Sequence, residues 1–256
     1  RKGWISSMDF ELTEEQKMVK DLAHKIAEEK IRPAAAKYDL SEEYPWDVLK
    51  VMAESDMFGL FIPEEYGGFA NSVMNLCLAT EEFSRACGGI AVCYAASALG
   101  TFPIVLFGTD EQKKKYLPDL AKGKKVAAFA ITEPEAGSDA SGIKTVAKKE
   151  GDYYILNGLK HFITNGGDAE TYVVIAMTDK SKGARGASAA KDDAATRACA
   201  AALRARGDGV AIDEVADAAG QPLVRATAID STKVEYEGAV LTLEAFAARL
   251  RAAGKP

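Results

Sequence analysis

The spacing of apolar residues changes near Val126, and this change narrows the set of architectures more than any other property of the chain. Before Val126, apolar residues recur every three or four positions; after it, short apolar segments alternate with polar residues and are separated by Gly-Asp, Asn-Gly and Gly-Gly pairs. The first pattern is typical of amphipathic helices and the second of antiparallel strands joined by tight turns. The sequence therefore predicts an α+β protein, with an all-helical domain followed by a partial antiparallel sheet or open barrel.

Capping residues and prolines predict where the helices begin and end. Thr13–Gln16 and Thr109–Gln112 are capping boxes. The first helix is expected to end at Arg32-Pro33, and the second opens at Pro45-Trp46. A third helix follows Val73, and its charged end, with Glu81, Glu82 and Arg85, is interpreted as a solvated face.

The run from Gly89 to Phe107 is nearly uncharged and approaches the length of a membrane span. Its alanine-rich middle, together with Ser97, Thr101 and Pro103, favours instead a helix buried all round within the helical domain. We therefore expect no membrane span.

The second half carries two turns next to hydroxyl side chains. The predicted strands are VAAFAIT, TVAKK, YYIL, LKHFIT and TYVVIAM. Asn157-Gly158 predicts a hairpin turn, and Asn165 to Gly167 predicts another. Thr132 and Thr164 then lie near the ends of neighbouring strands. The turn that follows Pro134 exposes backbone amides, which suits an anionic ligand.

Charge and cysteine usage exclude some classes of function. The net charge of -6 and the absence of a basic, aromatic stripe argue against a nucleic-acid partner. The four cysteines lack C-x-x-C spacing and the chain has two histidines, so no metal site is predicted and a reducing compartment is expected. Residues 1–7 are interpreted as a leader.

Residues 190–256 differ from the rest in composition, being rich in alanine and arginine. Asp192–Arg206 and Thr242–Ala253 are predicted to be helical, and Leu223–Ile229 and Lys233–Tyr236 to be extended. A fusion, an altered reading frame and a small added domain all fit this change, and the tail stays an unassigned α/β segment.

Three motifs carry a resemblance to a known family. They are FAITEPEAGSD at 129–139, KHFITNGG at 160–167 and PEEYGG at 63–68. Together they resemble the acyl-CoA dehydrogenase family, whose flavin-binding segment has a T/S-E-P-x-x-G-S-D run followed by K-x-F/W-I-T-N-G. The resemblance covers about residues 8–189, with a helical N-terminal domain at 8–124 and a flavin-binding β-domain at 125–189.

The resemblance implies FAD-dependent α,β-dehydrogenation of an acyl-CoA thioester in fatty acid metabolism and β-oxidation. An electron-transferring flavoprotein would accept the electrons. It also implies a homo-oligomer when the C-terminal half is present, and a cytoplasmic location in a bacterium in preference to the mitochondrial matrix.

The motifs also imply which residues contact the ligands. Thr132 would serve the pyrimidine side of the flavin, Thr164 the N5 side, Phe162 one ring face, and Gly137 and Ser138 the pyrophosphate. The full set expected to bind FAD is Phe129, Ile131, Thr132, Gly137, Ser138, Phe162, Ile163 and Thr164. The set expected to bind substrate is Ser138, Val92, Ala95 and Leu99, with plain core packing as the alternative for the last three.

The catalytic base is not identified by the sequence. In the family it is a Glu, which in most members comes from the C-terminal helical domain, and no motif here matches it. Glu133 and Glu135 are interpreted as caps of turns. The acids of the tail are the remaining candidates, and these are Glu214, Glu235, Glu237 and Glu244.

Two other classes of function stay open. One is a flavin or acyl-CoA binding module without turnover, which includes a fusion or truncated chain that lacks the base. The other is an interaction domain built on the same scaffold.

Overall fold

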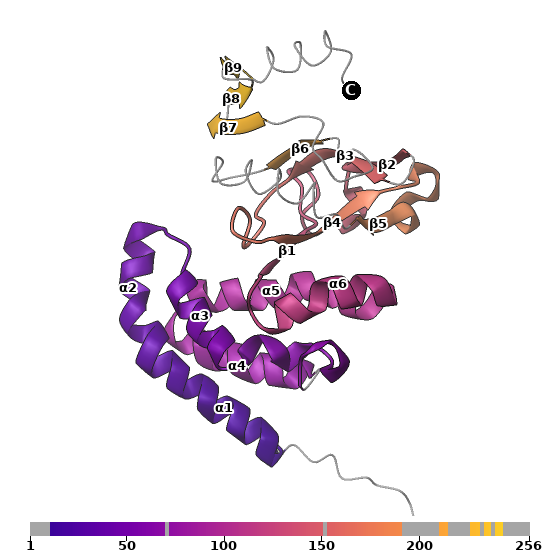
Figure 1. Ribbon diagram of the computed structural model, residues 1–256. Helices are drawn as coiled ribbons and strands as arrows, with labels where there is room; N and C mark the ends of the chain where they lie inside the picture. Colours follow the sequence, from indigo (N-terminus) through magenta and orange to yellow (C-terminus); the bar gives the residue numbers. More distant parts are fainter. Residues whose placement is uncertain are drawn as a thin grey trace, which may run out of the picture.

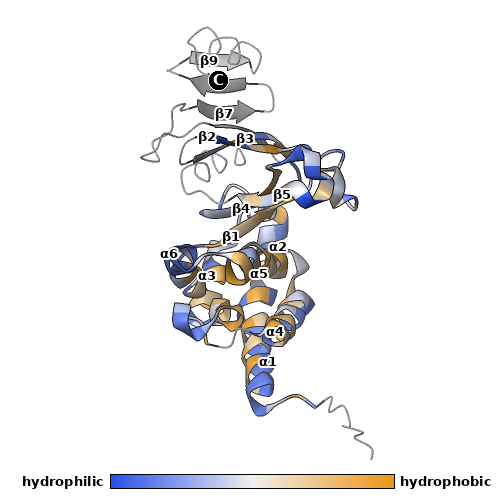
Figure 2. Cartoon of the chain, turned by 90° about the vertical axis from the view of Figure 1, so that its right-hand side faces the viewer, coloured by the Kyte–Doolittle hydropathy of each residue, from blue (hydrophilic) through white to orange (hydrophobic). Residues whose placement is uncertain are grey.

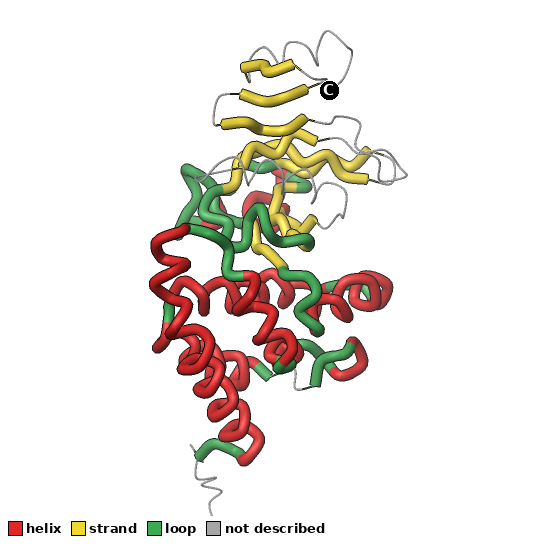
Figure 3. The backbone as a smooth tube through the Cα atoms, turned by 60° about the vertical axis from the view of Figure 1, so that its left-hand side comes forward, coloured by secondary structure: helices red, strands yellow, loops and turns green. Residues whose placement is uncertain are grey.

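The α-helices precede the strands along the chain, as the α+β prediction requires (Figures 1 and 3). The structure is a computed structural model, which describes residues 11–69, 72–150 and 153–190 and the strands at 210–214, 226–230, 233–236 and 239–242. The α-helices are α1 (Glu14–Ile26), α2 (Arg32–Ser41), α3 (Trp46–Glu54), α4 (Val73–Ala86), α5 (Gly88–Phe107) and α6 (Asp110–Ala121). The π-helix is η1 (Ala27–Ile31), and the 3-10 helices are η2 (Met57–Phe61), η3 (Glu64–Tyr66), η4 (Ala140–Gly142) and η5 (Lys180–Gly186). The strands are β1 (Ala127–Ala130), β2 (Val146–Glu150), β3 (Tyr153–Lys160), β4 (Thr171–Met177), β5 (Ala187–Ala190), β6 (Val210–Glu214), β7 (Ala226–Asp230), β8 (Lys233–Tyr236) and β9 (Ala239–Thr242).

The predicted capping boxes are confirmed, but the predicted end of the first helix is wrong. Thr13 and Thr109 each accept the N3 amide and have their own amide capped by Gln16 and Gln112. Pro33 does not end the helical segment. The helix passes through the π-turn η1 and restarts as α2 with Pro33 in its first turn, where a residue without an amide hydrogen is tolerated.

Aromatic rings form the centre of the helical domain. Tyr94 of α5 is fully buried, and its ring lies 5.4 Å from Phe58, 6.0 Å from Phe61 and 5.2 Å from Phe83, centroid to centroid. Its hydroxyl donates to the carbonyl of Met57 at 2.9 Å, so the one polar atom is satisfied. Figure 2 shows hydrophobic residues along α4 and α5, in the middle of this domain.

The helix α5 packs on β1 and joins the two halves of the chain. Gly100 permits a close approach, since an added Cβ would lie 2.8 Å from the Cβ of Ala127 and 3.0 Å from the amide nitrogen of Ala128. The amide of Ala127 donates to Ser97 Oγ at 3.0 Å. Within the part of the chain that the structure describes, α5 is the one helix long and apolar enough to cross a membrane, and half of it is buried. The absence of a membrane span stays a prediction.

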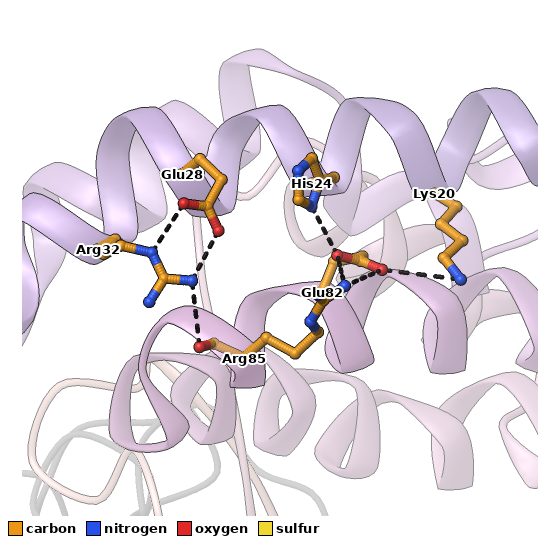
Figure 4. Close-up of polar contacts among 6 residues, drawn as sticks. All are labelled: Lys20, His24, Glu28, Arg32, Glu82 and Arg85. Carbon is orange, nitrogen blue, oxygen red and sulfur yellow. Dashed lines mark hydrogen bonds and ion pairs between the residues drawn. The ribbon is translucent and has the colours of Figure 1, made fainter.

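At the charged end of α4, Glu81 and Arg85 are exposed as expected, but the solvated-face interpretation is wrong for Glu82. Glu82 is 1% exposed and lies against α1, where His24 Nδ1 is 2.9 Å from Oε2 and Lys20 Nζ is 3.8 Å from Oε1 (Figure 4). Arg85 Nη1 donates to the same carboxylate at 3.1 Å. The cations of Lys20 and Arg85 and the imidazole of His24, on two helices, therefore surround one buried carboxylate. Helical spacing on α4 alone could not reveal this.

The sheet is mixed rather than purely antiparallel. Its order is β1-β4-β2-β3-β6, with β5 beside β4. The pairs β2–β3, β3–β6 and β4–β5 are antiparallel as expected, whereas β4 pairs in parallel with both β1 and β2. The parallel pairs arise because the chain makes long connections after β1 and after β3, instead of a tight turn.

The predicted hairpin turn at Asn157-Gly158 is also wrong, since both residues lie inside β3. Asn157 pairs with β2 and β6, and Gly158 pairs with β6. Glycine is needed there for another reason. A Cβ at Gly158 would lie 2.2 Å from Thr145 Oγ1 and 2.6 Å from its Cα, so only glycine lets the two segments approach.

The two tail segments that were predicted to be extended contain strands, whereas β6 and β9 were not predicted. The predicted strands correspond to β7 and β8, which form an antiparallel three-stranded sheet with β9. Thr242 ends β9 and does not begin a helix. The predicted helix at 192–206, the remainder of that at 242–253 and the leader at 1–7 lie outside the described residues.

Candidate functional site

A tight loop follows β1 and leaves two amides open. Glu133 and Ala136 exchange backbone hydrogen bonds of 3.1 Å in both directions, which closes the turn around Pro134. Beyond it, Gly137 and Ser138 are exposed, and within the described chain their amides make no backbone hydrogen bond. Open amides on a fixed turn are suited to an anionic group.

A second loop follows β3. The predicted strand LKHFIT ends earlier than expected, at Lys160, because the backbone turns at Phe162 (φ 54) and Asn165 (φ 65). The predicted turn from Asn165 to Gly167 is present. It is held by the buried side chain of Asn165, which donates to the carbonyls of Cys93 at 2.9 Å and Ala127 at 3.0 Å.

These two loops meet, although β4 and β2 lie between β1 and β3 in the sheet. The amide of His161 donates to the carbonyl of Thr132 at 2.8 Å. Lys160 Nζ donates to the carbonyl of Ile131 at 2.8 Å. The structure thus brings Thr132 and the segment that leads to Thr164 side by side, through loop contacts and not through neighbouring strands.

A buried ion pair lies under the junction of the loops. Lys160 Nζ is 2.7 Å from Glu133 Oε1, with side chains 0% and 5% exposed. Burial favours a raised pKa for Glu133, but hydrogen bonds from Lys160, Lys144 and Thr145 outweigh it and lower the pKa to about 2. Burial lowers the pKa of Lys160 from its ordinary value, and the carboxylate only partly opposes this.

The groups expected to contact a flavin differ in exposure. Phe162 is 83% exposed, although it is a large apolar side chain. Thr132, Thr164, Phe129, Ile131 and Ile163 are partly buried around the junction. In the described residues neither threonine hydroxyl makes a hydrogen bond. The loops therefore offer free hydroxyls and one open aromatic face.

The three α5 residues expected to line the acyl cavity lie along one side of that helix. Val92 is 50% exposed and Leu99 51% exposed, and Ala95 between them is partly buried. They are not the core positions that the alternative interpretation required. Their contact with an acyl chain stays a prediction.

The roles of two residues of the site were not predicted from the sequence. Asn165 was assigned to its turn without a partner, and Lys160 was given no role. The signal for Lys160 is its alternation with Leu156 and Gly158, which places it on the inward face of β3.

No base is assigned by the geometry. Glu214 and Glu235 lie in β6 and β8, and Glu237 and Glu244 lie outside the described residues. Glu135 is exposed and pairs with Lys144. Among the described side chains, no group of three or more His, Cys, Asp or Glu could hold a metal ion.

Two family models and a curated relative match this chain. Residues 13–124 match the model of the acyl-CoA dehydrogenase N-terminal domain, and residues 128–221 match that of the middle domain. The second match passes position 189, where the motif resemblance stops. A short-chain specific acyl-CoA dehydrogenase of Clostridium acetobutylicum is 45% identical over 183 residues, which is 71% of this chain and 48% of that protein.

Solved structures agree. Butyryl-CoA dehydrogenase from Megasphaera elsdenii superposes with a TM-score of 0.68 at 41% identity, over 73% of this chain and 50% of that one. An acyl-CoA dehydrogenase from Bacillus anthracis, solved with FAD, gives 0.64 at 38% identity, over 72% and 31%. The chain spans about half the length of the curated relatives it matches. On the motifs, the fold and these matches, the chain belongs to the acyl-CoA dehydrogenase family.

Proposed function

We propose that this chain binds FAD between its two loops and contributes to the α,β-dehydrogenation of an acyl-CoA thioester. The observation that carries the proposal is the junction of the loops, where the amide of His161 bonds the carbonyl of Thr132 and brings together the two motifs of the family. A relative with the same fold was solved with FAD.

The residues present fit a flavin in three respects. Phe162 offers a ring that is 83% exposed and can cover an aromatic ligand. Thr132 and Thr164 have hydroxyls without a described partner. At Gly137 an added Cβ would meet nothing within 4 Å, so a phosphate can approach the open amides of the turn.

FAD, when bound, would supply a hydride acceptor for the β hydrogen of the substrate. The residues of this chain would bind the flavin and orient it. Thr132 would donate to the pyrimidine side, where negative charge develops, and Thr164 would bond near N5. Gly137 and Ser138 would hold the pyrophosphate. The α proton needs a base, and no residue is assigned to that role.

The partners and location belong to this proposal. Acyl-CoA would be the substrate and an electron-transferring flavoprotein the acceptor. A homo-oligomer would form if the C-terminal half of the relatives is present, and the location would be the cytoplasm.

A matched pair of variants tests FAD binding. Phe162→Ala removes the proposed ring contact, and Phe107→Ala, at the end of α5, removes a ring of equal exposure (83%) outside the loops. Stacking of aromatic rings contributes roughly 0.5–1.5 kcal/mol beyond area burial, so we expect a dissociation constant raised about tenfold for Phe162→Ala. Flavin fluorescence titration measures it. Equal affinities of the two variants would contradict the proposal.

Turnover is tested by anaerobic mixing. With FAD and acyl-CoA, the 256 residues alone are expected to bleach the flavin slowly, since a positioned base contributes about a hundredfold to ten-thousandfold. Rapid bleaching would show that the tail supplies the base. Replacement of Glu214, Glu235, Glu237 and Glu244 one at a time by Gln would then identify it.

A further inference from the structure

The carboxylate of Glu133 ties together three segments of the candidate site. One oxygen accepts Lys160 Nζ at 2.7 Å, at the end of β3, and the amide of Thr145 at 3.0 Å. The other accepts the amide of Lys144 at 2.5 Å, just before β2. A single side chain of the first loop therefore fixes that loop to two strands.

Lys160 in turn holds both neighbours of Thr132. Its ammonium donates to the carbonyl of Ile131 at 2.8 Å and to the carboxylate of Glu133. The next amide, that of His161, donates to the carbonyl of Thr132 itself at 2.8 Å. The residues before and after Thr132 are thus anchored, which fixes the position of its backbone and the direction of its Cα–Cβ bond.

The energetics of buried charges indicate what this ion pair contributes to the structure. Both side chains are 5% exposed or less, so both have lost hydration. A buried ion pair is often no more stabilising than apolar residues of the same volume, but removal of one partner leaves an uncompensated charge. The pair is therefore better explained by the geometry that it imposes than by the stability that it adds.

We propose that Lys160 and Glu133 are positioning residues for the flavin, which hold Thr132 where its hydroxyl meets the pyrimidine side of the ring. The inference rests on the proposed function. Neither residue touches the ligand in this account. Each acts through the backbone on either side of Thr132.

Single and paired variants separate positioning from stability. Lys160→Met and Glu133→Gln each break the pair, and the double variant Glu133→Gln/Lys160→Met removes both charges together. The control is Glu135→Gln, in the same loop, where the pair with Lys144 is 71% and 72% exposed. Exposed pairs of this kind contribute little.

Three measurements are made on each variant: the midpoint of urea unfolding, hydrogen exchange of the amides from 131 to 138, and the FAD dissociation constant. For each single variant we expect faster exchange and at least tenfold weaker FAD binding. The double variant should recover much of the urea midpoint but not the FAD affinity. Glu135→Gln should match the wild type in all three.

The outcomes are distinguishable. Wild-type exchange and FAD affinity in a folded double variant would overturn the inference alone, because the loop would then need no buried pair. Absence of FAD binding by the wild-type chain would overturn the proposed function, and the flavin role of the pair with it.

Discussion

Replacing Glu82 by Gln tests the buried anion that joins α1 to α4. The change keeps the shape of the side chain and removes its charge. Two partners lie within hydrogen-bond distance, His24 at 2.9 Å and Arg85 at 3.1 Å, and Lys20 lies farther away at 3.8 Å. The change leaves no partner buried, since the side chains of His24, Lys20 and Arg85 are 51%, 39% and 61% exposed.

The exposure of the partners sets the size of the effect. Hydrogen bonds to charged groups contribute about 1.5–3 kcal/mol each when buried, but exposed pairs contribute only about 0.2–1 kcal/mol. Glu82 is buried and its partners are half exposed, so its contacts fall between these limits. We expect Glu82→Gln to lower the free energy of unfolding by about 2 kcal/mol.

Urea unfolding followed by far-ultraviolet circular dichroism measures this difference. Glu81→Gln is the control, because Glu81 is the exposed neighbour on the same helix and surface changes stay within about 0.5 kcal/mol. If Glu82→Gln cost no more than Glu81→Gln, the cluster would contribute nothing and our reasoning would fail.

The difference should also depend on pH. Burial favours a raised pKa for Glu82, but the hydrogen bond with His24 and the charges of Arg85 and Lys20 lower it below the ordinary 4.5. A carboxyl group whose folded pKa is lowered stabilises the fold above its unfolded pKa. The difference in free energy of unfolding between the wild type and Glu82→Gln should therefore be largest near neutral pH and decrease below about pH 4.5.

Three further changes test the packing around the site, each measured by the free energy of unfolding. Gly100→Ala should lower the free energy of unfolding by about 1–3 kcal/mol, because the added Cβ would clash with β1 and α5 is packed against that strand. Gly89→Ala is the control, because a Cβ there would meet no atom within 4 Å. Equal effects of the two variants would refute the close contact. Asn165→Ala should cost roughly 2–4 kcal/mol, since two carbonyls lose a donor and alanine disfavours φ 65, and a cost under about 1 kcal/mol would contradict this. Gly158→Ala should cost about 1–3 kcal/mol through the clash of its Cβ with Thr145. A neutral result would mean that Thr145 can move away from β3 at little cost.

Local signals in the sequence predicted the fold well where the cause is local. The capping box at Thr13 depends on residues three apart, and both hydrogen bonds are present. The change of hydrophobic period near Val126 marks the passage from helices to strands. Both follow from backbone geometry within a few residues.

Two wrong predictions have a different cause, which is contact with residues distant in sequence. Gly158 was predicted to make a turn, but its lack of a side chain allows the close approach of Thr145. Glu82 was predicted to be solvated, but α1 covers it with His24. No window of adjacent residues contains these two contacts. Pro33 is a separate case, because the π-turn that carries the helix on to it lies directly before it in the sequence.

The candidate site was predicted in part. The motifs located Thr132, Thr164 and Phe162, and the structure brings their loops together. The pair of Lys160 and Glu133, which holds the loops in place, was missed because charged residues are usually on the surface.

A two-dimensional amide spectrum of the labelled chain, recorded with increasing FAD, tests the central claim most directly. We predict that the shifts concentrate in residues 129–138 and 162–164, the two loops that meet at Thr132. The amides around Glu82, which lies in the α1–α4 cluster, should not move. Shifts that spare both loops, or a spectrum unchanged at saturating FAD, would contradict the assignment of the flavin site.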